Sequence, residues 1–207
     1  DETGTPTGVA GCPPDYFAQD GQLWGNPLYD WDRMRQDGYA WWKERIRAAS
    51  RLFDVIRIDH FRGLESYWAV PYGEPTARNG HWVKGPGEDF IRALKETFPE
   101  LRLIAEDLGF LTEEVIRLQQ NSGFPGMKVL EFAFDAREPS NYLPHRYPRN
   151  CICYTGTHDN ETLAQWLAGA SAQTIAYIME YLHIKDAADC ADAILHTGAA
   201  SVADTFI

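Results

Sequence analysis

Three short acidic segments lie where predicted β-strands run out into loops. They carry Asp59, Glu106 and Asp159, each of which follows an apolar run. Their spacing fits one carboxylate for every one or two βα units. In (β/α) barrels the catalytic residues lie at this end of the strands. Three carboxylates at one rim therefore indicate chemistry on a glycosidic bond.

The first segment pairs a carboxylate with a cation. Arg57 lies two residues before Asp59, so both project to the same side of the strand. A neighbouring cation keeps a carboxylate ionised at neutral pH, which a nucleophile requires. A purely structural Arg–Asp pair at a strand end fits the same residues. His60 is predicted to donate a hydrogen bond to a substrate hydroxyl, or else to cap the loop.

The second segment places two acids side by side. The charge of Asp107 is expected to raise the pKa of Glu106, and a carboxyl that stays protonated can act as a general acid on a leaving oxygen. In the alternative, one acid caps the next helix and the other is solvated. Asp135 also follows a predicted strand, but it stands alone, which favours a structural use.

The third segment contains His158, Asp159, Asn160 and Glu161. Asp159 is a candidate for the third carboxylate of the rim. The competing interpretation is that these residues begin a helix, with Asp159 as its N-cap.

Apolar runs typical of strands alternate with amphipathic helices along the chain. The predicted strands cover 55–58, 101–105, 127–134 and 151–155, and the predicted helices cover 38–54, 88–97, 112–121, 160–169, 171–183 and 187–200. This alternation predicts parallel βαβ units and the α/β class. Four such units make half of an eight-stranded barrel, which takes about 250 residues. An open doubly wound sheet is the alternative, although no glycine-rich phosphate loop follows any strand.

Two long segments show no sustained period. Residues 1–37 and 63–87 are rich in glycine, proline and aromatic residues, and we predict both to be long loops. The first and last residues of the chain resemble the interior of a longer protein. We therefore expect a fragment, in which 1–207 is part of one catalytic domain.

Composition narrows the possible partners. The chain has 207 residues, 44% of them hydrophobic, and a formal charge of −11, which disfavours nucleic acid and anionic membranes as partners. No apolar run has the length of a membrane span. The histidines and cysteines lack metal-ligand spacing, so we expect no metal, no organic cofactor, and reduced buried thiols at Cys12, Cys151, Cys153 and Cys190.

Five segments together closely resemble one enzyme family. Residues 8–17, 21–29, 57–63, 105–109 and 156–160 are similar, in order, to the 4-α-glucanotransferases (amylomaltases, or disproportionating enzymes) of the α-amylase clan. The resemblance implies a (β/α)₈ barrel and retaining transfer of α-1,4-glucan segments among maltooligosaccharides or glucans derived from starch or glycogen. It also implies a cytoplasmic location, or a plastid in a plant.

The resemblance assigns roles to particular residues. Asp59 would be the nucleophile, Glu106 the acid and then the base, and Asp159 the carboxylate that orients ring hydroxyls. Substrate contacts would come from Arg57, His60, His158 and Asn160, and from a loop on the acceptor side within 1–37 that carries Tyr16, Phe17, Gln22, Trp24 and Asn26.

The family's full chain is more than twice as long as this one. About half the barrel would be present, and the isolated piece is expected to be weakly active or inactive, or to self-associate through exposed strand edges. The alternatives are an α-glucan hydrolase, the transferase domain of a debranching enzyme, and a non-catalytic fragment that binds maltooligosaccharides.

Overall fold

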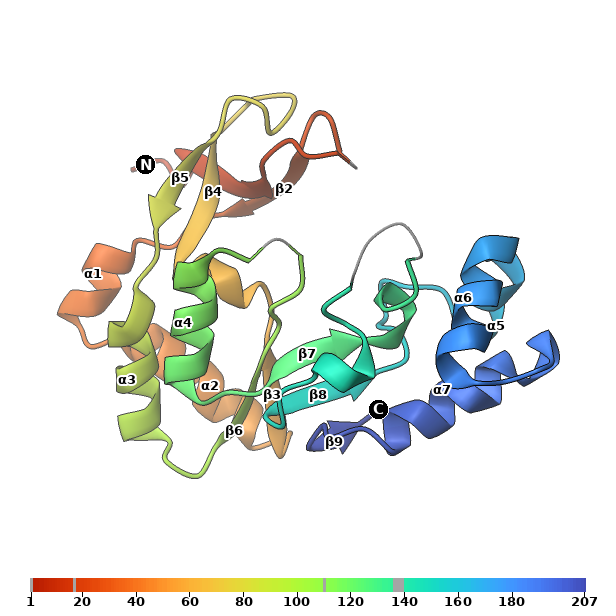
Figure 1. Ribbon diagram of the computed structural model, residues 1–207. Coiled ribbons are helices and arrows are strands. Elements are labelled where there is room, and N and C mark those ends of the chain that lie inside the picture. The colour runs from red at the N-terminus through yellow and green to blue at the C-terminus, as the bar shows by residue number, and fades with distance from the viewer. Residues whose placement is uncertain (1, 17, 110, 136–139) are drawn as a thin grey trace. The chain divides into compact units, whose positions relative to one another are not determined.

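The computed structural model describes residues 2–16, 18–109, 111–135 and 140–207 (Figure 1). The chain forms two compact units, Asp1–Phe124 and Pro125–Ile207, which we describe separately. Across the described ranges, no helix is both long enough and apolar enough to cross a membrane.

The first unit contains a parallel strand pair with the predicted helices around it. These elements are α2 (Ala40–Ser50), β3 (Val55–Ile58), α3 (Gly87–Thr97), β6 (Arg102–Ala105) and α4 (Glu113–Ser122). β3 pairs with β6 in parallel, with Ile58 opposite Ala105. Helices α3 and α4 pack against each other (Figure 1). The predicted βαβ pattern is confirmed here, and Thr112 caps α4 by accepting from the Val115 N–H.

A four-stranded antiparallel sheet corrects the two loop predictions. Its order is β2-β1-β4-β5, and its strands are β1 (Gly8–Cys12), β2 (Gln22–Pro27), β4 (Ser66–Pro71) and β5 (His81–Lys84). Together with the short helix α1 (Trp31–Gln36), it shows that the loop predictions for 1–37 and 63–87 are wrong. These strands are short and their pairing is partly non-local, since Val9 lies opposite Val70. Glycines in β1 also interrupt the alternation of polar and apolar side chains that would indicate a strand. A Cβ at Gly11 would lie 2.4 Å from the Gln22 carbonyl oxygen, so the close pairing of β1 with β2 requires glycine there.

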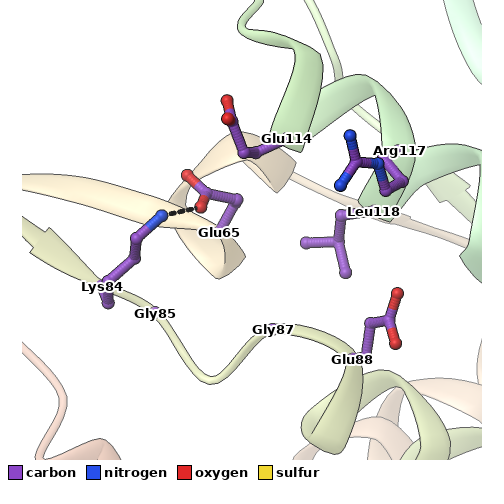
Figure 2. A pocket seen from close by; sticks show the side chains of 8 residues that line it. All are labelled: Glu65, Lys84, Gly85, Gly87, Glu88, Glu114, Arg117 and Leu118. Atoms are coloured by element: carbon purple, nitrogen blue, oxygen red, sulfur yellow. Dashed lines mark hydrogen bonds and ion pairs between the residues drawn. The ribbon is translucent and has the colours of Figure 1, made fainter.

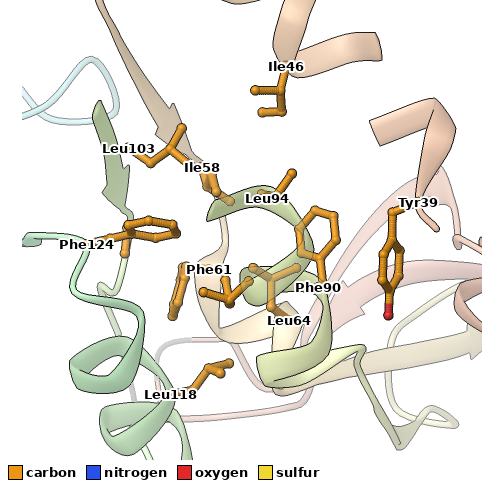
Figure 3. Packing of buried hydrophobic residues seen from close by; sticks show 12 residues of the cluster. Tyr39, Ile46, Ile58, Phe61, Leu64, Phe90, Leu94, Leu103, Leu118 and Phe124 are labelled. Atoms are coloured by element: carbon orange, nitrogen blue, oxygen red, sulfur yellow. The ribbon is translucent and has the colours of Figure 1, made fainter. Parts of the chain in front are cut away.

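The core of the first unit holds the helices against the end of β3 (Figure 3). Phe90 and Leu94 of α3 lie on one helix face, and Phe90 is fully buried beside Tyr39. Phe61, also fully buried, begins a short 3₁₀ helix (η1, Phe61–Leu64) just past the predicted nucleophile. Packing of this kind fixes the backbone on which the rim residues stand.

The second unit has three parallel strands in the order β7-β8-β9, formed by β7 (Gly126–Val129), β8 (Cys151–Tyr154) and β9 (Thr205–Phe206). Its helices are α5 (Leu163–Gly169), α6 (Ala172–Leu182) and α7 (Cys190–Ala199), and its 3₁₀ helices are η2 (Leu130–Phe132), η3 (Pro144–Arg146) and η4 (Ala187–Asp189). The cysteines are free. Those of this unit are buried, as predicted, whereas Cys12 of the first unit is only partly buried, so the prediction is wrong for that thiol.

One strand of this unit ends earlier than predicted. The chain leaves β7 after Val129 and turns into η2, so the predicted strand over 127–134 is wrong beyond that point. Leu130, Ala133 and Phe134 are all buried, and their spacing is helical rather than alternating. As a result, the first acidic residue after this strand is Glu131, not Asp135.

Candidate active site

Asp59 is the first residue after β3, and it is freely accessible. Its carboxylate is 79% exposed and lies 3.4 Å from the Arg57 guanidinium, with Oδ1 paired to Nη2. The predicted Arg–Asp pair is therefore present at the strand end. The exposed side chain is accessible to a substrate, as a nucleophile must be.

Glu106 follows β6 directly and makes four hydrogen bonds to backbone groups, two through its carboxyl and two through its own main chain. Its carboxyl accepts from the His60 N–H (2.7 Å, Oε2) and the Leu108 N–H (2.8 Å, Oε1). Its own N–H donates to the Ile58 carbonyl and its carbonyl accepts from the Phe61 N–H, both at 2.9 Å. The carboxyl and the backbone of Glu106 are thus fixed relative to the end of β3.

Two opposing effects act on the pKa of Glu106. Burial raises this pKa most strongly, and the charges of Asp59 and Asp107 raise it further, while the two N–H donors lower it. The raising effects prevail, so the carboxyl retains its proton to a higher pH than an ordinary glutamate. The predicted influence of Asp107 is present but smaller than that of burial. Neither acid caps the next helix, because Thr112 does so.

His60 links the two carboxyl groups. Its backbone is left-handed (φ 49°), which directs its N–H at Glu106, and a Cβ at Gly63 would lie 2.9 Å from its ring. Burial, and then the charge of Arg62, lower its pKa to about 4, against the opposing effect of Asp59. The imidazole is therefore uncharged at neutral pH.

The predicted acceptor-side residues are divided between a loop and an edge strand. Gln22, Trp24 and Asn26 lie on β2 and are exposed, as is Tyr16 before it, whereas Phe17 lies outside the described residues. The Trp24 ring meets the His60 ring edge-on at 4.7 Å, and its Nε1–H donates to Gln22 (3.1 Å). Strand β2 therefore brings an aromatic side chain to the Asp59 and Glu106 rim.

The sequence analysis gave no role at this rim to Cys12 or Arg62, which both lie beside it. Cys12, at the end of β1, is near enough to Arg62 and Glu106 for their charges to act on its thiol, although burial is the main cause of its raised pKa. The Arg62 guanidinium stacks 4.3 Å above the Trp82 ring of β5. The antiparallel sheet thus contributes to the surroundings of Glu106.

Asp159 lies in the second unit, in a tight loop after β8. Asn160 Oδ1 accepts from the Thr157 N–H (2.9 Å) and hydroxyl (2.8 Å), and the Asp159 N–H meets the Thr157 hydroxyl oxygen at 3.3 Å. His158 Nε2 is 3.3 Å from Asp159 Oδ1, and both side chains are exposed. The helix begins later, at Leu163 with Thr162 as N-cap, so the alternative role of Asp159 as a cap is excluded.

Glu131, in the second unit, is a further acidic residue to which the sequence analysis gave no role. It follows β7 within η2, is 7% exposed, and its N–H donates to the Thr155 carbonyl (3.1 Å). Burial and the charge of Glu161 raise its pKa. The available signal was a carboxylate after an apolar run, the same pattern that identified Asp59 and Glu106.

A hollow elsewhere on the first unit has a different character (Figure 2). An ion pair between Lys84 and Glu65 borders it on one side, and charges of both signs line the rest. Its lining residues are Glu65, Lys84, Gly85, Gly87, Glu88, Glu114, Arg117 and Leu118. None of the predicted site residues contributes to it.

An exposed carboxylate and a buried carboxyl with a raised pKa stand at the ends of two adjacent parallel strands. Enzymes that cleave glycosidic bonds by acid and nucleophilic catalysis use such a pair of carboxyl groups. The chain belongs to the 4-alpha-glucanotransferase family, whose family model matches residues 2–207. The resemblance drawn from the sequence is therefore confirmed.

Individual relatives agree with this membership. The chain is 50% identical over 203 residues to a 4-alpha-glucanotransferase of Streptococcus pneumoniae, covering 98% of this chain and 40% of the relative. It is 52% identical over 165 residues to that of Clostridium butyricum, covering 80% and 34%. The solved amylomaltase from Streptococcus agalactiae in complex with acarbose matches with a TM-score of 0.94 and 39% identity, covering 100% of this chain and 42% of that one. The chain spans about two fifths of the length of these proteins.

Proposed function

We propose that the chain is part of the catalytic (β/α)₈ barrel of a 4-α-glucanotransferase. The arrangement of Asp59 and Glu106 at the hydrogen-bonded ends of β3 and β6 is the observation that supports this most directly. The parallel pairs β3-β6, β7-β8 and β8-β9 are compatible with about half of such a barrel. We further propose that 1–207 serves one catalytic domain, in the cytoplasm or, in a plant, in a plastid.

The reaction is a double displacement. The Asp59 carboxylate attacks the anomeric carbon of an α-1,4-glucan, while Glu106 gives its proton to the departing 4-oxygen. The bond to the leaving glucan breaks as the bond to Asp59 forms. Glu106, now a carboxylate, takes the proton from the 4-hydroxyl of an acceptor glucan, whose oxygen displaces Asp59. Anomeric configuration and bond number are both conserved.

The other predicted residues hold the sugars. Asp159 orients ring hydroxyls and stabilises the transition state, and His158 and Asn160 lie beside it in the same loop. Arg57 pairs with Asp59 (3.4 Å), and neutral His60 offers hydrogen bonds to the sugar. Tyr16, Phe17, Gln22, Trp24 and Asn26 are assigned to the acceptor. The solved Streptococcus agalactiae amylomaltase is in complex with acarbose.

Incubating the whole natural protein that carries these residues with maltotriose, and resolving the products, tests the proposal. We expect glucose together with maltopentaose and longer chains, because transfer conserves glycosidic bonds. Glucose and maltose in equal amounts, with new reducing ends in proportion to turnover, would identify a hydrolase instead. Binding without turnover would identify a carbohydrate-binding fragment.

We expect Trp24→Ala to shift the reaction from transfer towards hydrolysis. The exposed ring lies against His60, where an acceptor sugar can stack and limit the entry of water. The ratio of new reducing ends to transferred glucosyl units should rise several-fold. One stacking contact favours the acceptor sugar over water by about 1 kcal/mol, and the variant loses this preference. Trp41→Ala, at an exposed tryptophan on α2, is the matched control. An unchanged ratio would remove Trp24 from the acceptor site.

The 207-residue chain alone is expected to turn over maltotriose poorly or not at all. An incomplete barrel leaves strand edges with unpaired backbone groups and lacks sugar subsites. Light scattering should show self-association that increases with concentration. A monomer with the specific activity of the whole natural protein would contradict both expectations.

A further inference from the structure

Glu131 is a buried carboxyl for which the transfer reaction as proposed has no use. It is 7% exposed, and in the described part of the chain its Oε1 is enclosed without a hydrogen-bond partner. A buried polar atom left in this state is costly, so its retention calls for a local reason. The reason is to be sought in what the carboxyl touches.

The Glu131 carboxyl supports the loop that carries Asp159. A Cβ placed on Gly156 would lie 2.9 Å from each carboxyl oxygen of Glu131, so the carboxyl fills the space where any other residue would carry a side chain. The Glu131 N–H also donates to the Thr155 carbonyl, one residue earlier. Both the backbone and the side chain of Glu131 therefore face the start of loop 156–161.

We propose that Glu131 is a positioning residue of the transfer site, which supports loop 156–161 from beneath and so fixes the carboxylate of Asp159. The proposal rests on the transferase function proposed above and deepens it. Asp159 is exposed, and its N–H donates to the Thr157 hydroxyl (3.3 Å) in a loop that Thr157 and Asn160 close between themselves. Glu131 lies against Gly156 at the start of this loop and gives it a buried support.

The surroundings of Glu131 favour the uncharged form of its carboxyl more than those of an ordinary glutamate do. Burial raises the pKa of Glu131 most. The charge of Glu161, which lies in the supported loop, raises it further. A carboxylate at this place would be desolvated and would repel Glu161. Glutamine has nearly the same shape and no charge, so it should replace Glu131 in function.

The first test compares Glu131→Gln with Glu131→Leu, measuring kcat and KM for maltotriose in the whole natural protein. Leucine replaces the planar carboxyl that lies against Gly156 with a branched, tetrahedral end, so kcat should fall about tenfold with KM nearly unchanged, because Asp159 acts mainly in the transition state. Glutamine should restore kcat to within about twofold. Equal kcat values in wild type and both variants, or equal losses in both variants, would overturn the proposal.

Gly156→Ala tests the same contact from the other side and decides the matter if the leucine variant does not fold. The added methyl group presses on the Glu131 carboxyl, so kcat should fall while Glu131 itself is unchanged. In the double variant with Glu131→Ala, the fold-loss of kcat should be smaller than the product of the two single fold-losses. The shorter alanine leaves room for the methyl group added at position 156. Full activity of Gly156→Ala would contradict the support role.

The protonation state has its own readout in the melting temperature as a function of pH. A raised folded-state pKa gives stability that is present below the ordinary glutamate pKa, about 4.3, and is lost as pH rises through the folded-state value. Glu131→Gln should therefore melt like wild type near pH 4 and above it at higher pH. Glu161→Gln is the matched control and should narrow that difference.

These outcomes separate the inference from the function. If the wild-type protein shows no transfer from maltotriose, the proposed function fails, whatever the melting curves show. If transfer is normal and the glutamine and leucine variants behave alike, the function stands and the role of Glu131 fails.

Discussion

Asp59→Asn is expected to abolish transfer between maltotriose molecules. The amide cannot form the covalent ester with the anomeric carbon, and loss of a nucleophile costs about 10⁴-fold or more in kcat. Among the described residues, no other carboxylate pairs with Arg57 at the end of β3 and could take over the role of Asp59. Product chromatography over long incubation measures the residual rate.

A matched variant and a binding measurement complete this experiment. Asp54→Asn changes an exposed acid just before the same strand and should leave kcat unaltered. Calorimetry should show that Asp59→Asn still binds maltooligosaccharide, because the neutral amide has nearly the same shape. Turnover in the Asp59→Asn protein within tenfold of wild type would remove Asp59 from the role of nucleophile.

Glu106→Gln is expected to lower kcat on maltotriose by about 10²–10⁴-fold, the usual contribution of a general acid. The effect should depend on the leaving group. A maltosyl fluoride donor releases fluoride without needing a proton, so its first step should survive the substitution. Attack by the acceptor then lacks its base, and the glycosyl-enzyme should accumulate. Mass spectrometry of the trapped protein should find the added sugar on the peptide that contains Asp59.

The raised pKa of Glu106 gives this prediction a pH signature. The acid form does the work in the first step, so the first-step rate on maltotriose should fall as pH rises past the folded-state pKa of Glu106. The burst of fluoride from maltosyl fluoride should lack that alkaline decline. Asp107→Asn removes a charge that raises this pKa, and it should move the decline to lower pH. A decline at the same pH for both donors would assign it to another group.

The parallel elements of this chain could be predicted because their signals are local. The apolar runs that became β3, β6 and β8 are bounded by helices with clear amphipathic spacing, and Asp59, Glu106 and Asp159 follow them directly. The antiparallel sheet was missed because β1 pairs with β4 from a distant part of the sequence, and the glycines in β1 obscure any alternation. Pairing of this kind is decided by tertiary contacts.

Glu131 was missed because a strand was predicted to run too far. The apolar residues after Val129 suggested a continuous strand, within which Glu131 would be an outward side chain rather than a rim residue. Packing of Leu130, Ala133 and Phe134 into one core turns the chain early. Sequence also gives no measure of burial, which is the main cause of the raised pKa values of Glu106 and Glu131.

The Asp59 and Glu106 pair owes its geometry to main-chain atoms. Ile58 lies opposite Ala105, the Glu106 N–H donates to Ile58, and the carboxyl of Glu106 is held by two further main-chain donors. None of these bonds depends on the identity of a neighbouring side chain. Divergence among relatives can therefore exchange core residues and redesign the neighbouring loops while Glu106 keeps its place beside the end of β3. Selection can alter the side chains around this pair without having to rebuild the backbone that carries it.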